Sequence, residues 1–158
     1  MTVDDLETPA VIVELDIMNA NVKKMQDFLS AHGIACRPHV KTHKIPAIAH
    51  LQLRAGAIGV TCQKLSEAEV MVNAGMMDIL IPYNIVGPAK VDRLARLVRQ
   101  ATVRVTVDSV TTLEALSATM HREDLTLPVM IECDLGAGRC GVQSLEELTD
   151  LARRIERL

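Results

Sequence analysis

Apolar segments recur along the chain and alternate with amphipathic ones. The segment "PAVIVEL" (9–15) predicts a short strand, and "DIMNANVKKMQDFLSAHG" (16–33) predicts a helix that stops at Gly33. Further apolar runs follow at intervals of roughly 20–26 residues, the size of a repeated unit of one strand and one helix. These runs are "IACRPHVK" (34–41), "AIGVTCQ" (57–63), "DILIPYN" (78–84), "TVRVTVD" (102–108) and "LPVMIECD" (127–134).

Helix start signals fall between these runs. Pro88 opens the segment "GPAKVDRLARLVRQ" (87–100), in which apolar residues recur at helical spacing. The pattern S/T-x-x-E, typical of a helix N-terminus, occurs at Ser66–Glu69, Thr111–Glu114 and Ser144–Glu147. Apolar strands that alternate with helices predict a parallel sheet covered by helices.

Polar residues at the carboxyl ends of the runs favour an α/β fold of the TIM-type (β/α) barrel. Such a barrel collects site residues from the ends of several strands, whereas an open doubly wound sheet concentrates them at one switch point. A barrel of eight units needs about 200 residues. We therefore expect residues 1–158 to be the N-terminal part of a barrel, with about five of its eight units. A smaller open sheet built from the same units is the alternative. The polar strand-end residues are Lys41, His43, Gln63, Asn84, Asp108 and Asp134.

Composition narrows the classes of function. Apolar residues make up 49% of the chain, which is enough for a core, and the net charge is only −3. This small net charge argues against nucleic acid and a membrane surface as partners. The scarcity of aromatic residues, Phe28 and Tyr83, also argues against stacking on nucleobases. The four cysteines show no C-x-x-C spacing, three of them lie in apolar runs as small buried residues do, and the N-terminus lacks a signal-peptide pattern. These features favour a reducing cytoplasm.

The octapeptide "RPHVKTHK" (37–44) places several cations next to an apolar run. If this segment is a strand, alternate residues share one face, and the cationic face points into the barrel. A lysine amine buried beside other cations loses its proton more readily and becomes a nucleophile toward aldehydes, the first step of Schiff-base catalysis. Strand parity favours Lys41 over Lys44 for this role. A solvated edge strand, whose charges only keep it soluble, is an equally open alternative. The cationic face comprises Arg37, His39, Lys41 and His43.

A second segment, "ECDLGAGRCGV" (132–142), contains the pattern G-x-G-x-x-G between a strand and a helix. On its own this pattern suggests dinucleotide binding. However, it lies on the fifth unit instead of the first, and the acidic residue expected about 20 residues later would fall at or beyond Leu158. The other interpretation is that the glycines allow close backbone approach and that Arg139 faces an anionic oxygen. The glycines concerned are Gly136, Gly138 and Gly141.

These segments together resemble a known family. "RPHVKTHK", "TCQKLSEAEVMVNAG" (61–75), "DILIPYNIVG" (78–87), "VTVDS" (105–109) and the pattern E-x-D-x-G-x-G-R-x-G-V are similar to the N-terminal barrel of the D-threonine aldolase and D-serine dehydratase family. Its members are fold-type III pyridoxal-phosphate enzymes related to alanine racemase. The resemblance implies pyridoxal 5'-phosphate as cofactor and a D-amino acid as substrate. It is compatible with a homodimer of the full-length protein.

The resemblance also assigns roles to single residues. Lys41 becomes the Schiff-base lysine, with His39 and Arg37 as neighbours that shape its pocket. Arg139 matches the family arginine that approaches the phenolic oxygen of the cofactor. Gln63 faces the same cavity, where a cofactor-binding role and a structural role are both open.

Other polar residues receive structural roles or none. Asn84, Asp108 and Asp134 are expected to hydrogen-bond at strand ends. In the resembled family a C-terminal β-domain, absent from this chain, supplies the divalent-metal ligands. A metal is therefore expected only in the full-length protein, with no ligand among these residues. Histidines without an assigned role are His32, His50 and His121.

The sequence thus predicts a pyridoxal-phosphate-dependent lyase, of the D-threonine aldolase or D-serine dehydratase type, that uses a Lys41 Schiff base. Activity is expected of the full-length protein and not of this chain alone. The alternatives are a noncatalytic pyridoxal-phosphate binding or homeostasis protein and an amino-acid racemase. A dinucleotide-binding module built on Gly136–Gly141 is more remote.

Overall fold

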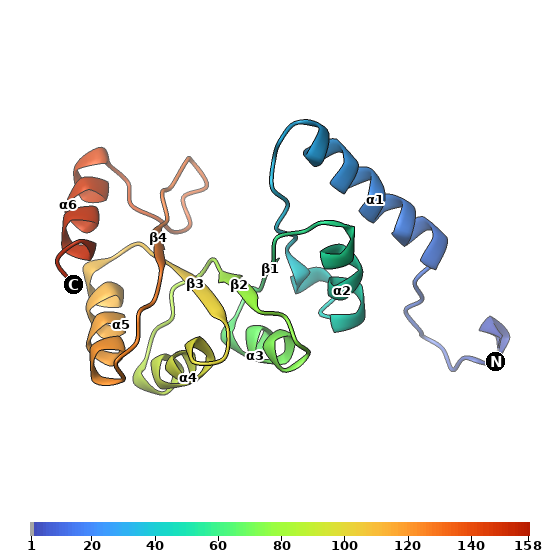
Figure 1. The fold of residues 1–158 in the computed structure, drawn as a ribbon, viewed down its shortest axis with the longest axis horizontal. Coiled ribbons are helices and arrows are strands. Elements are labelled where there is room, and N and C mark those ends of the chain that lie inside the picture. The colour runs from blue at the N-terminus through green and yellow to red at the C-terminus, as the bar shows by residue number, and fades with distance from the viewer. Residues whose placement is uncertain (1) are drawn as a thin grey trace.

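A computed structural model describes residues 2–158 and contains one parallel sheet. Its four strands pair in the order of the chain, β1-β2-β3-β4, and every pairing is parallel (Figure 1). The prediction of a parallel α/β sheet is therefore confirmed. The strands are β1 (Val60–Thr61), β2 (Asp78–Ile81), β3 (Thr102–Val107) and β4 (Val129–Ile131).

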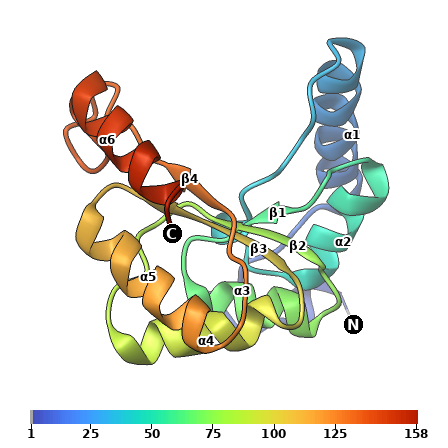
Figure 2. The ribbon, with the colours of Figure 1, turned by 60° about the vertical axis from the view of Figure 1, so that its left-hand side comes forward.

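Helices follow the strands and cover one face of the sheet. Figure 2 shows α3, α4 and α5 along that face, with α6 and α1 at the two ends of the sheet. None of the helices in this part of the chain is both long and apolar enough to cross a membrane. The helices are α1 (Leu15–Ala31), α2 (Pro46–Ala55), α3 (Leu65–Asn73), α4 (Pro88–Val98), α5 (Val110–Arg122) and α6 (Leu145–Ile155), with short 3₁₀ helices at Val3–Asp5 and Val40–Thr42.

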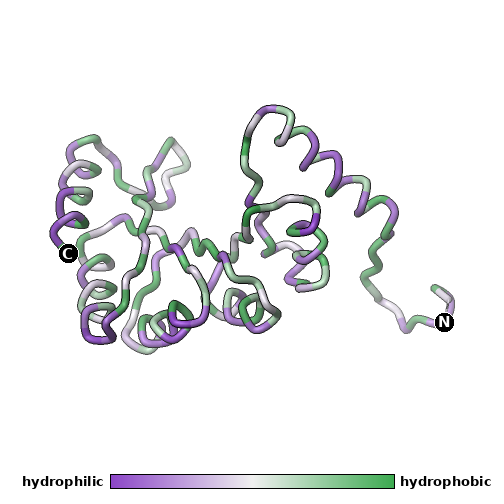
Figure 3. Tube along the Cα trace, in the orientation of Figure 1, coloured by the Kyte–Doolittle hydropathy of each residue, from purple (hydrophilic) through white to green (hydrophobic). Residues whose placement is uncertain are grey.

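The core lies between the sheet and these helices. Strand residues that point toward the helices, such as Ile79, Ile81 and Val105, are fully buried, and Leu94 and Leu116 meet them from α4 and α5. Burial of each such side chain stabilises the fold by about 1.5–3 kcal/mol. In Figure 3 the strand segments show green positions interrupted by paler and purple ones, and α1 also alternates between green and purple.

The opposite face of the sheet is more polar and open to solvent. Alternate strand residues point to it: Asp78 and Leu80 on β2, Arg104 on β3 and Met130 on β4. Met130 remains 50% exposed. This face corresponds to the interior side of a barrel, and it carries the polar side chains discussed below.

Two predicted strands are wrong. Residues 9–14 form no strand within the described chain and are exposed, because no neighbouring segment offers them a ladder. The run 34–41 makes only one isolated parallel bridge, from His39 to Thr61, before the chain turns into the 3₁₀ helix Val40–Thr42. Pro38 lies in this run and has no amide hydrogen to donate, which shortens the ladder. The sheet therefore has four strands and one bridge where five strands were predicted.

The helix starts were predicted with mixed success. Pro88 begins α4, Ser144 caps α6 and Gly33, with φ +67°, ends the turn after α1, all as expected. The other two capping boxes are each wrong by two residues, since Lys64 and Ser109 are the N-caps of α3 and α5. Helix starts depend on local backbone geometry as well as on the S/T-x-x-E pattern.

Candidate functional site

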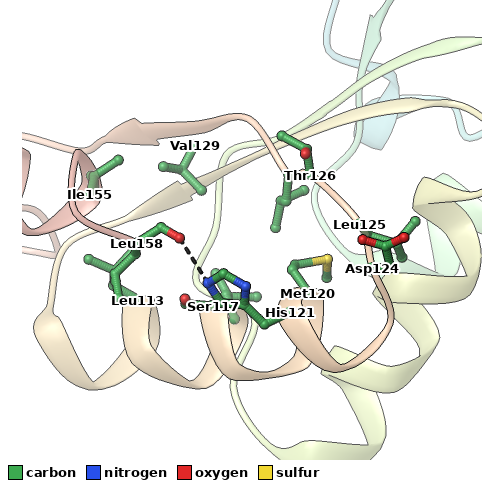
Figure 4. A pocket seen from close by; sticks show the side chains of 12 residues that line it. Leu113, Ser117, Met120, His121, Asp124, Leu125, Thr126, Val129, Ile155 and Leu158 are labelled. Carbon is green, nitrogen blue, oxygen red and sulfur yellow. Dashed lines mark hydrogen bonds between the residues drawn. The ribbon is translucent and has the colours of Figure 1, made fainter.

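One hollow of the described residues lies away from the predicted site residues. It measures about 400 Å³ and lies between α5, the turn that follows it and the end of α6 (Figure 4). Its walls are mainly leucine, methionine and valine, and His121 at its rim donates from Nε2 to the carbonyl oxygen of Leu158 over 2.9 Å. We therefore place the candidate site elsewhere, at the carboxyl edge of the sheet, where the polar residues gather.

Two groups of residues form this edge. The first, called the lysine end, comprises residues 37–44 and 61–67. The second, called the glycine loop, comprises residues 132–142 and connects β4 to α6. In Figure 1 both lie on the upper side of the sheet, with β2 and β3 between them.

Lys41 lies in the 3₁₀ helix and not on a strand. The parity argument for its orientation is therefore wrong, and its side chain is exposed where burial was predicted. Its ammonium nitrogen Nζ nevertheless donates to Oε1 of Gln63 over 3.2 Å. This contact brings together two residues that the sequence had assigned to one site. In residues 2–158 no carboxylate pairs with the Lys41 amine.

Lys44 is held quite differently. Its Nζ pairs with Oε1 of Glu67 over 3.2 Å. The other oxygen of Glu67, Oε2, accepts the backbone amide of Gln63 over 2.9 Å. Glu67 is not singled out by the capping-box pattern, which points to Ser66 and Glu69. The pattern Q-x-L-x-E does include Glu67. It occurs at residues 63–67 and again at residues 143–147.

His39 lies beside Lys41 and is neutral at neutral pH. Burial and then the positive charge of Lys41 lower the pKa of His39 below its ordinary value of 6.5. Its Nδ1 accepts the backbone amide hydrogen of Lys41 over 3.3 Å. A neutral imidazole beside the amine adds no further charge to the lysine end.

Two members of the predicted cationic face point away from Lys41. Arg37 donates from Nη1 to Oδ1 of Asp78, the first residue of β2, over 2.8 Å, and so lies toward the amino edge of the sheet. His43 accepts the amide hydrogen of Ile45 on Nδ1 over 3.0 Å, at the start of α2. Arg37 and His43 are therefore engaged by Asp78 and Ile45. The 3₁₀ turn after His39 separates the directions of these side chains.

Asp134 organises the first half of the glycine loop. Its carboxylate accepts the amide hydrogens of Gly136 over 2.9 Å and of Gly138 over 3.0 Å, and the side-chain amide of Gln143 over 3.2 Å. The two glycine amides lower the pKa of Asp134 below its ordinary value. A dinucleotide phosphate would need these same amides, which argues against the G-x-G-x-x-G interpretation.

Asp108 and Asn84 fix the second half of the loop. Asp108 follows β3 directly, and its Oδ2 accepts the amide hydrogen of Gly141 over 3.0 Å. Its Oδ1 accepts from the side-chain amide of Asn84 over 2.8 Å. Asn84, Asp108 and Asp134 thus hydrogen-bond at strand ends, as the sequence predicted.

Arg139 lies between these two anchored halves and is exposed. Its guanidinium has no ion-pair partner in residues 2–158. Next to it, the thiol of Cys140 donates to Oε1 of Glu132 over 3.1 Å, and this contact raises the pKa of Cys140. A rigid loop that carries an unpaired arginine is suited to bind an anionic group.

Among the remaining cysteines, Cys62 is buried and held as a thiol. Burial, followed by the charge of Glu67, raises the pKa of the Cys62 thiol to about 12. All four cysteines are free, but only Cys62 is buried, so the expectation that three of them are core residues is wrong. Cys133 is exposed because it lies past the end of β4, at the start of the glycine loop.

The donor set fits an aldehyde cofactor that carries a negative charge. It offers a lysine amine with a neutral amide and a neutral imidazole as neighbours, and an unpaired arginine on the same edge of the sheet. In residues 2–158 no three His, Cys, Asp or Glu side chains gather in a way that could hold a metal ion.

Comparison with known proteins identifies the family. The model of the family described as alanine racemase, N-terminal domain, matches residues 13–158. The chain belongs to this family.

Relatives with assigned names support the same membership. A 3-hydroxy-D-aspartate aldolase of Paracoccus denitrificans is 41% identical over 97% of the chain, and a D-threonine aldolase of Arthrobacter sp. is 43% identical over 87%. The chain spans 40% and 36% of these two proteins. The crystal structure of D-threonine aldolase from Filomicrobium marinum matches with a TM-score of 0.95 and 41% identity, over 98% of this chain and 42% of that one.

Proposed function

We propose that residues 1–158 form the N-terminal part of the pyridoxal-phosphate barrel of a lyase that acts on a D-amino acid. Membership of the alanine racemase N-terminal family supports the cofactor. The named relatives, two aldolases and a D-threo-3-hydroxyaspartate dehydratase of Delftia sp. that is 37% identical, support a lyase. A β-hydroxy D-amino acid is the substrate class that their names share. The rest of the barrel, about three of eight units, would follow in the full-length protein.

One observation carries this proposal: among residues 2–158 the Lys41 amine pairs with no carboxylate and donates to the neutral amide of Gln63. A lysine amine that no carboxylate holds is available to attack an aldehyde. We therefore assign the covalent attachment of the cofactor to Lys41. Gln63 orients the amine, and His39 limits the cationic charge around it.

Arg139 is proposed to hold the anionic side of the cofactor. The glycine loop is anchored by Asp134 and Asp108, and within residues 2–158 no carboxylate pairs with the arginine. When bound, pyridoxal phosphate supplies an electron sink for breaking bonds at the Cα atom of an amino acid. The full-length protein would add the phosphate-binding loops, any divalent-metal ligands and any homodimer contact.

The other candidate functions have less support. A noncatalytic pyridoxal-phosphate protein or an amino-acid racemase is compatible with the family, but the named relatives at 37–43% identity are lyases. A dinucleotide module is disfavoured because Asp134 already accepts the glycine amides that a phosphate would need.

The experiment is a labelling test on the complete gene product that contains this chain. Incubation with pyridoxal phosphate followed by borohydride reduction should leave a pyridoxyl group on the peptide that contains Lys41. Lys41→Ala should abolish this label, and Lys44→Ala is the matched control that should retain it. Cleavage of D-threonine by the unaltered protein would then support the lyase class. Absence of label from Lys41 would contradict the proposal.

A further inference from the structure

We propose that Glu67 is a positioning residue that directs the cofactor aldehyde to Lys41 by holding the neighbouring Lys44. This inference rests on the proposed function. Glu67 is only 8% exposed, which is rare for a glutamate without a specific partner. Both of its carboxylate oxygens are used, one by each of two segments of the lysine end.

The first contact removes Lys44 from competition. The Lys44 ammonium lies 3.2 Å from Oε1 of Glu67. An amine held in an ion pair must break that contact before it can attack an aldehyde. The backbone supports this pairing, because Lys44 adopts φ +55°, a left-handed conformation that is uncommon for a lysine. Lys44 therefore occupies a fixed position three residues beyond Lys41.

The second contact supports Lys41 through Gln63. Oε2 of Glu67 accepts the Gln63 amide hydrogen over 2.9 Å, and the Gln63 side chain accepts from Lys41 over 3.2 Å. The Glu67 carboxylate thus contacts Lys44 directly and reaches Lys41 only through Gln63. Lys44 meets a negative charge, whereas Lys41 meets the neutral amide of Gln63.

The glycine-loop side of the sheet provides an internal comparison. Glu147 occupies the same position of a second Q-x-L-x-E turn, and its Oε2 accepts the Gln143 amide hydrogen over 2.7 Å. In residues 2–158 no lysine pairs with Glu147, and it is exposed. The contact from the glutamate to the backbone amide of the glutamine thus occurs at both helix starts. Of these two glutamates, Glu67 is the one that also pairs with a lysine.

The test compares the labelling of both lysines in the complete gene product. Glu67→Gln keeps an amide oxygen for the Gln63 backbone and removes the charge that holds Lys44. After reaction with pyridoxal phosphate and borohydride, the ratio of Lys44 to Lys41 label should rise about two- to tenfold in this variant. Glu147→Gln makes the same chemical change at the matched turn and should leave the ratio unchanged.

A second measurement uses the unaltered protein, in case Glu67→Gln does not fold. After any bound pyridoxal phosphate has been removed with hydroxylamine, brief acetylation with limiting acetic anhydride should modify Lys41 faster than Lys44, although both side chains are exposed. Faster acetylation of Lys44 would overturn the inference. So would an unchanged label ratio in a folded Glu67→Gln variant whose parent carries label on Lys41. A parent with no label on either lysine would instead overturn the proposed function, and this inference with it.

Discussion

The lysine end and the glycine loop occupy the same edge of the sheet but are held in different ways. In the glycine loop, the carboxylates of Asp134 and Asp108 accept backbone amides, so the path of the chain itself is fixed. At the lysine end, side chains contact side chains, as in the pairing of Lys41 with Gln63 and of Lys44 with Glu67. Backbone anchoring suits a group that must stay in one place, such as Arg139. Side-chain contacts suit an amine that must exchange partners.

The strongest test of the rigid loop is Gly141→Ala. Gly141 has φ +101°, and a Cβ there would lie 2.5 Å from the backbone nitrogen of Asp134. Because backbone atoms cannot yield easily, the unfolding free energy in urea should fall by about 3 kcal/mol or more. The matched control is Gly138→Ala, at φ +60° with no atom within 4 Å, which should cost only about 1 kcal/mol. Equal losses for the two variants would show that close approach does not shape the loop.

The next effect concerns the arginine that the loop carries. Arg139→Ala removes an unpaired exposed cation, so we expect little change in the unfolding free energy. Loss of a charge-assisted hydrogen bond to the cofactor should weaken binding of pyridoxal phosphate by about 10- to 100-fold. Absorbance titration of the complete gene product measures this affinity. An unchanged affinity would remove Arg139 from the site and leave the loop as a structural element.

The third prediction concerns the amino edge of the sheet, where Asp78 contacts Arg37 and Arg104 and makes stability depend on pH. Burial raises the pKa of Asp78, but Arg37 and Arg104 outweigh burial and leave it below the ordinary value of 3.8. The unfolded chain therefore binds the proton at higher pH, and the stability that Asp78 contributes is lost as pH falls through its folded pKa. Asp78→Asn should be less stable than the unaltered protein at pH 7, and the difference should shrink below about pH 4. Urea unfolding at several pH values measures it; a constant difference would contradict the shift.

The smallest effect compares the two Q-x-L-x-E turns. Ser144 caps α6 with its hydroxyl, which accepts the Glu147 amide hydrogen over 3.1 Å, whereas Lys64 occupies the same position of α3 without a side-chain cap. The two residues share an extended backbone, with φ −141° for Ser144 and φ −146° for Lys64. Lys64→Ser should stabilise the protein by about 0.5–1 kcal/mol, and Ser144→Ala should destabilise it by about 1 kcal/mol. Thermal unfolding measures both, and a destabilising Lys64→Ser would contradict this equivalence.

The sequence predicted the regular parts of the fold better than the site. The strand at 102–108 and the helix that begins at Pro88 were found because apolar periodicity and helix signals agree there. The run 34–41 looked equally apolar, yet Pro38 and the 3₁₀ turn at Val40–Thr42 limit its pairing to one bridge. A hydrophobic pattern does not show whether a segment has the amide hydrogens that pairing with a neighbouring strand requires.

The site residues were predicted in part for a similar reason. Lys41 and Gln63 do meet, but through a turn and not through shared strand parity. The pairing of Arg37 with Asp78 spans 41 positions of the chain, and no local pattern reveals such a contact. Glu67 was missed because the S/T-x-x-E pattern draws attention to Glu69. Its partners Lys44 and Gln63 become evident only in three dimensions.

The sequential strand order has a consequence for how the protein is made. Val60 pairs with Ile79, Ile79 with Val103 and Val105 with Val129, so each new strand joins one that lies only 19 to 24 positions earlier. Contacts between such near segments form quickly, because little loop entropy is lost. As the ribosome adds about 5–20 residues each second, the units can dock one after another as they emerge. Lys41 and Gln63 are then in contact before Arg139 has been synthesised, so the lysine end is assembled first on the nascent chain.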